Sequence, residues 1–297
     1  MSTAPAESAP LIPSMRWLLF LAAFLVFLAG VELFVFPLRT AEWFAWTVDP
    51  PMTAVFLGAA YWSAAVLEVA GARAASWSAA RVAVWPVFVF TTLTLVVTLI
   101  HLDRFHLSSD HPPLARFATW MWLAIYVLVP VAMLVIGWVQ LRARSPAATR
   151  GTASPATGTR VTLPLGVRVL LTAVTAVLLV VGVALLVAPV QAAALWPWPL
   201  TALTGRAVGA WLVGLGWAAG QAQWSGDARA VRTVGLTAVV FVLLQVIALL
   251  RYGQVLAWPG PPAIGYVAVL VAIGVASGWA LLSSREPSRR IASGNRT

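Results

Sequence analysis

The segment from Val169 to Val187 reads VLLTAVTAVLLVVGVALLV, and it decides the fold class. It contains no charged residue, and it is long enough to cross the hydrocarbon core of a bilayer as a helix. Polar and apolar residues do not alternate along it, as they would in a transmembrane strand. Because a lipid-exposed segment has to satisfy its own backbone hydrogen bonds, we expect an α-helix.

Seven further apolar segments have spanning length, so the sequence predicts an all-α polytopic membrane protein with eight transmembrane helices. Composition agrees, since 61% of the residues are hydrophobic, 9% are charged and the mean hydropathy is +0.90. A soluble domain has about 25% charged residues. The lipid bilayer is therefore the expected partner. The other segments are Trp17–Phe36, Thr53–Val69, Val82–Ile100, Ala118–Val139, Ala207–Gln221, Val234–Leu250 and Ala263–Leu282.

The chain divides into two related halves of four helices each. Phe36-Pro37 ends the first helix and Ala188-Pro189 ends the fifth, and further matches recur at offsets of 151 to 153 residues, such as Gly58 with Gly209. An even number of helices gives both halves the same orientation, so the repeats are parallel. We expect a disordered N-terminus (1–15), a first repeat (16–142), a flexible cytoplasmic linker (143–162), a second repeat (163–282) and a basic cytoplasmic tail (283–297).

The distribution of arginines predicts the orientation of the protein in the membrane. All 19 cations are arginine, and the formal net charge is +10. Fourteen of these arginines are spread over several segments on one side of the membrane, which is not the compact basic patch of a nucleic-acid-binding protein. The positive-inside rule places both termini in the cytoplasm. The arginines assigned to the opposite side are Arg39, Arg104, Arg116, Arg206 and Arg251.

All three histidines lie within one short stretch, His101–His111, after the third helix. If that helix continues, Asp103, His106 and Asp110 share one face at spacings of three and four. Imidazole and carboxylate ligands could then hold Zn²⁺ or another divalent ion. The alternatives are a solvated polar cap without a ligand and a histidine-based pH sensor.

Two glutamates lie inside apolar segments. Glu32 lies about one turn from the outer end of the first helix, where an ionised side chain is costly unless it is paired or hydrated. We expect it to pair with Arg39 or to join the histidine stretch. Glu68 is interpreted as an interfacial ion pair with Arg73 or Arg81. The candidate outer-face polar or metal site comprises Glu32, His101, Asp103, His106, Asp110 and His111.

The glycines of the sixth segment allow two interpretations. Small residues at four-residue spacing, such as Gly205 with Gly209, indicate close packing between helices. The same glycines make the segment look short and interrupted, which is typical of a transporter site when the other repeat has a matching segment. Gly58 is the only such interruption in the second segment.

Known chemical motifs are missing from the sequence. It contains no Cys, no Lys, no Walker A motif, no Gly-x-Ser-x-Gly and no His-Glu-x-x-His. No catalytic residue is assigned, and no cofactor is expected apart from the possible divalent metal.

Two runs, Thr98–His106 and Thr204–Leu212, resemble segments of uncharacterised multi-pass membrane proteins of high-GC bacteria. The resemblance implies a bacterial plasma-membrane protein, and it carries no activity. The sequence favours transport or sensing of a small solute or ion through an outer-face polar site. A membrane enzyme with a His/Asp metal site and a non-catalytic scaffold subunit of a membrane complex are the alternatives.

Overall fold

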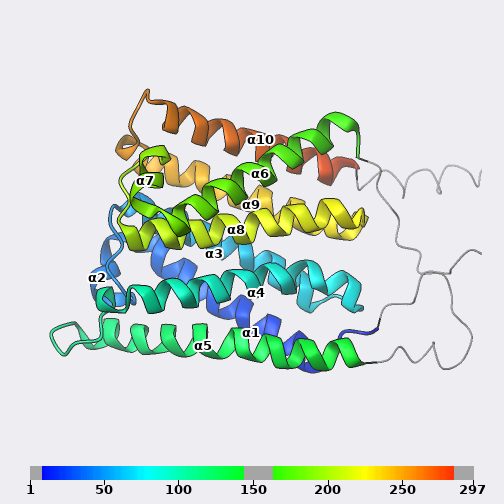
Figure 1. The fold of residues 1–297 in the computed structure, drawn as a ribbon, viewed down its shortest axis with the longest axis horizontal. Helices are drawn as coiled ribbons and strands as arrows, with labels where there is room; N and C mark the ends of the chain where they lie inside the picture. The colour runs from blue at the N-terminus through cyan, green and yellow to red at the C-terminus, as the bar shows by residue number, and fades with distance from the viewer. Residues whose placement is uncertain (1–8, 144–162, 284–297) are drawn as a thin grey trace, which may run out of the picture.

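The computed structural model describes residues 9–143 and 163–283, and within them the chain is helical. The long helices lie side by side, as Figure 1 shows. They are α1 (Pro13–Gly30, extended by the π-helical turn η1, Val31–Val35), α3 (Pro51–Ala72), α4 (Trp77–Ile100), α5 (Pro113–Arg142), α6 (Leu165–Val187), α8 (Ala202–Ser225), α9 (Ala228–Tyr252) and α10 (Pro261–Ser283).

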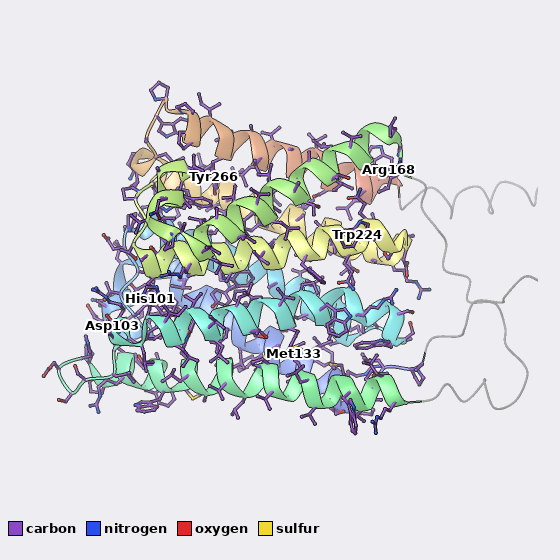
Figure 2. All side chains as sticks on the ribbon, in the orientation of Figure 1. His101, Asp103, Met133, Arg168, Trp224 and Tyr266 are labelled. Carbon is purple, nitrogen blue, oxygen red and sulfur yellow. The ribbon has the colours of Figure 1, made fainter. Side chains whose placement is uncertain are left out.

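Short helices cap one end of the bundle. These are η2 (Pro37–Arg39), α2 (Thr40–Trp43), η3 (Leu102–Arg104), α7 (Pro189–Ala192), η5 (Ala193–Leu195) and η6 (Gly253–Val255). We call this the α7 end, and we call the opposite end the Arg168 end. Figure 2 labels His101 and Asp103 at the first, and Arg168 and Trp224 at the second.

Seven of the long helices are long and apolar enough to cross a membrane, which confirms a multi-pass helical membrane protein. The helix outside this set is α8. It is 24 residues long, so the prediction that the sixth segment is short and broken by glycine is wrong. Glycine and glutamine lower the hydropathy of α8, and most of its side chains are buried against neighbouring helices.

Three glycines of α8, Gly209, Gly216 and Gly220, form a stripe that faces α6. A Cβ on Gly209 would lie 2.7 Å from the carbonyl oxygen of Gly182 on α6, and one on Gly216 would lie 3.0 Å from Leu179. The two backbones therefore touch through this stripe, as the small-residue spacing predicts. In α10 the same four-residue spacing does not bring the helix into close contact with a neighbour at Gly278, because nothing lies within 4 Å of a Cβ there.

The two halves pair their helices in the same way. α1 packs on α3 and α4 on α5 in the first half, and α6 packs on α8 and α9 on α10 in the second. The halves join through two equivalent seams, α3 with α9 and α4 with α8. The same backbone bond recurs at the α7 end, where the N–H of His106 donates to the Ala45 carbonyl (3.0 Å) and that of Ala257 donates to the Pro197 carbonyl (2.9 Å).

Residues of the predicted disordered N-terminus take part in the fold from residue 9 onward. The N–H of Trp77 donates to the Ala9 carbonyl at 2.9 Å, α1 begins at Pro13, and Met15 is fully buried. The Gln140 side chain bonds both Pro10 and Ile12. The helical bundle therefore includes residues before position 16, where the sequence places the start of the first repeat. The predicted linker and the predicted tail lie outside the described residues, apart from Ala143 and Ser283.

Candidate functional site

The histidine stretch does not continue as a helix. α4 ends at Ile100, η3 follows, and the chain then extends at Phe105. Phe105 is buried, and its ring packs against those of Trp46 and Trp122. The contacts of Phe105 hold the chain against the bundle in an extended conformation. Asp103, His106 and Asp110 therefore do not share the helical face that their spacing suggested.

His106 is only 3% exposed and ties two connections together. Its Nδ1 donates to the Phe44 carbonyl at 2.9 Å, which leaves Nε2 to accept from the Thr47 hydroxyl at 3.1 Å. Burial lowers the pKa of His106, the bond to Phe44 opposes this, and the His111 charge adds to the lowering. The rings of His106 and His111 lie 4.3 Å apart between centroids.

The carboxylates of the stretch lie apart from this pair. Asp103 forms an exposed ion pair with the adjacent Arg104 at 3.1 Å, and Asp110 accepts from Ser108 at 3.4 Å. Within residues 9–143 and 163–283, no three His, Asp or Glu side chains lie close enough to hold a metal ion. Both ring nitrogens of His106 are already bonded within the protein, so the geometry fits a structural link better than a metal ligand.

His101 faces the second half of the chain. Its Nε2 lies 2.7 Å from the guanidinium of Arg206 on α8 and must accept, because arginine only donates. Arg206 also donates to the Leu186 carbonyl at the end of α6 (3.0 Å). Burial and the Arg206 charge lower the pKa of His101. The two histidines therefore have different structural roles. His101 joins the two halves of the chain, and His106 joins two loops of the first half.

Glu32 lies in the π-helical turn η1, and its side chain has no hydrogen bond or ion pair with any described residue. The expected partner, Arg39, instead pairs with Glu42 at 2.9 Å. Arg251 reaches this turn from α9, but its guanidinium donates to the Phe34 carbonyl at 2.5 Å. The structure therefore gives Glu32 no partner among the residues proposed with it.

Glu68 is the buried acid that sequence reasoning misjudged. It is 2% exposed, and its Oε2 has no hydrogen-bond partner within the described part of the chain. The expected ion pair with Arg73 or Arg81 is not formed. α3 buries more of its surface than the other candidate spans, so a glutamate on this helix faces protein instead of the membrane surface.

A pair of tyrosines lies on the same side of α3 as Glu68. The hydroxyls of Tyr61 on α3 and Tyr126 on α5 are 2.7 Å apart in a buried hydrogen bond. Tyr61 precedes Glu68 by seven residues, which is two helical turns and about 10 Å along the axis. This spacing is visible in the sequence and would have been the signal for a polar interior.

A small cavity of about 10 Å³ lies next to Tyr61, on the α4–α8 seam. Thr94, Trp46 and Trp211 line it, and both the Thr94 hydroxyl and the Trp46 indole N–H are buried without a partner. Such a cavity has room for about one water molecule. Next along α4, Thr98 accepts from the Trp122 indole at 3.0 Å.

The cavities of the second half have mainly apolar linings instead. The larger cavity, about 350 Å³, is lined by side chains such as Leu178, Phe241 and Ile273, with the Trp196 indole N–H as an unpartnered donor. The counterpart of Glu68 by the 151-residue offset is Ala219. Among the described residues, a buried acidic group is therefore found in the first half and not in the second.

Comparisons of the chain with protein-family models, with curated proteins and with solved structures found no match.

Proposed function

We propose that this multi-pass membrane protein moves or senses a small ion, and that the ion is the proton. The observation that carries the proposal is Glu68, a carboxyl group buried inside a membrane-spanning helix with one oxygen unpartnered. Ionisable groups inside a membrane are costly, and they mark ion and proton pathways. This replaces Glu32 with Glu68 as the central residue.

The groups beyond Glu68 support a proton more than a larger solute. The hydroxyls of Tyr61, Tyr126, Thr94 and Thr98 can each donate and accept a hydrogen bond, as a relay requires. The cavity beside them, about 10 Å³, has room for a water molecule and not for a hydrated metal ion.

The topology that we propose has eight spans in two parallel repeats, in a bacterial plasma membrane with both termini cytoplasmic. The equivalent helix pairings and the recurring loop bond support the repeat. The orientation rests on the arginines. Reporter fusions test it: a periplasm-active reporter should work when inserted after Ser108 and fail when fused after Thr297. The reverse pattern would invert the topology.

Proton movement is tested with purified protein in liposomes that contain a pH-sensitive dye, with a potassium gradient and valinomycin as the driving force. Glu68→Gln should abolish dye acidification, because the amide keeps the size of the side chain and cannot release a proton. Glu42→Gln is the matched control, since Glu42 is 48% exposed and pairs only with Arg39. Equal flux through the wild type and Glu68→Gln would refute the proposal.

The other two functions predict different outcomes. A metal-dependent enzyme would bind stoichiometric Zn²⁺ or another divalent ion, and His106→Ala would remove it. A scaffold subunit would retain its co-purifying partners in Glu68→Gln and would show no proton flux. No contact in the described residues favours either function over proton movement.

A further inference from the structure

A groove of about 1000 Å³ opens on the α3–α9 seam, toward the Arg168 end. α1, α3, the start of α4 and α9 line it. Three arginines stand at the end nearest the helix termini, Arg73, Arg229 and Arg232, and the rest of the lining is almost entirely apolar. This site is distinct from the polar interior around Glu68.

The three arginines carry charge that the protein does not neutralise. All are exposed, and within residues 9–143 and 163–283 the ion pairs are Arg39 with Glu42 and Arg104 with Asp103. Asp227, the acid nearest in sequence to Arg229 and Arg232, uses its Oδ1 to accept from the backbone N–H of Arg229 at 2.8 Å. The exposed guanidinium groups at this end of the groove can therefore bind an anion.

The connection that carries Arg73 is held in place. Arg16 on α1 donates to the carbonyl of Ala72 at 2.9 Å and to that of Ala74 at 3.1 Å. These two carbonyls flank Arg73. Because its backbone is anchored on both sides, Arg73 is presented next to the α9 arginines without the ordering cost that a free loop would have.

The remaining wall of the groove is apolar and could contact the acyl chain of a lipid. Phe27, Trp62, Val66 and Leu236 line the groove, and Ala70 leaves space along α3. The Trp62 indole N–H is satisfied by the Phe27 carbonyl at 3.0 Å, so it offers no polar group to the groove. From Trp62 to the end of α3 the helix rises about 15 Å. That is half of the roughly 30 Å hydrocarbon core, the depth of one leaflet.

We propose that this groove binds an anionic glycerophospholipid, with the phosphate among Arg73, Arg229 and Arg232 and an acyl chain along α3 and α9. Arginine recognises phosphate oxygens through two parallel N–H bonds, and basic pockets between membrane helices suit such headgroups. The occupant would bridge the two halves of the chain at one of their two seams.

Native mass spectrometry of the purified full chain tests the proposal with phosphatidylglycerol and phosphatidylcholine of identical chains. Phosphatidylglycerol should bind more tightly to the wild type. Replacing the three groove arginines by glutamine should weaken the binding of phosphatidylglycerol about tenfold or more, since each arginine attracts the anionic headgroup electrostatically. The control variant replaces Arg81, Arg142 and Arg168 by glutamine, which removes the same charge at the same end.

A second pair of measurements identifies the source of the phosphate. Ala70→Phe fills the groove and should weaken phosphatidylglycerol binding while the arginines remain. Inorganic phosphate, added at equal concentration, should not displace the lipid. Equal weakening in the two arginine variants would overturn the proposal in favour of unspecific charge. Displacement by phosphate, together with normal binding to Ala70→Phe, would overturn it in favour of a free-anion site. Neither measurement depends on proton flux.

Discussion

Gly209 tests the packing that holds the second half together. A Cβ at this position would lie 2.7 Å from the carbonyl oxygen of Gly182 and 3.1 Å from the Leu185 Cβ. The first obstacle is backbone, which cannot rotate away as a side chain does, so Gly209→Ala has to push α8 from α6. Gly137 on α5 is the matched control, because nothing lies within 4 Å of a Cβ there.

The size of the effect follows from two opposing contributions. Alanine is favoured over glycine inside a helix by about 1 kcal/mol, and this gain applies at both positions. Overpacking costs about 1–3 kcal/mol and applies only at Gly209. The free energy of unfolding of Gly209→Ala should therefore be about 1–3 kcal/mol below that of Gly137→Ala.

Unfolding of the detergent-solubilised protein by sodium dodecyl sulfate, followed by tryptophan fluorescence, measures the difference. The 16 tryptophans provide the signal. Gly58→Ala should behave as Gly209→Ala does, since a Cβ on Gly58 would lie 2.6 Å from the Phe34 backbone nitrogen. If Gly209→Ala is as stable as Gly137→Ala, the close backbone contact between α6 and α8 is wrong.

Two further predictions concern buried polar groups. Gln245 is fully buried, donates to the Phe56 carbonyl at 3.3 Å and accepts from Tyr266 at 2.9 Å. Gln245→Leu should cost about 1–3 kcal/mol of unfolding free energy because the Tyr266 hydroxyl loses its partner, and adding Tyr266→Phe should cost little more; full additivity would contradict this coupling. Because the pKa of His106 is lowered in the fold, the unfolded chain takes up the proton first, and stability should fall as the pH drops below about 6.5. A pH series of thermal unfolding should show a shallower fall for His106→Gln, whereas an unchanged slope would place the pH dependence elsewhere.

The sequence by itself determined the membrane class and the positions of the helices. Hydropathy is a local property, so a charge-free run such as Val169–Val187 predicts its helix without knowledge of its neighbours. It also indicated the close packing at Gly209, since four-residue spacing places small side chains on one face. The sequence predicted α8 too short, because glycine and polar residues that look like an interruption can lie inside a helix when neighbouring helices bury them.

Only the tertiary structure decided which polar residues share an environment. Glu32 and Glu68 look alike in sequence, each a single acid in an apolar run, but α1 lies at the edge of the bundle and α3 at its centre. His101 and His106 are five residues apart, and the turn that buries Phe105 sends one to Arg206 and the other to Phe44. Burial depends on which face of a helix meets a neighbour, and that is set by contacts between residues far apart in the chain.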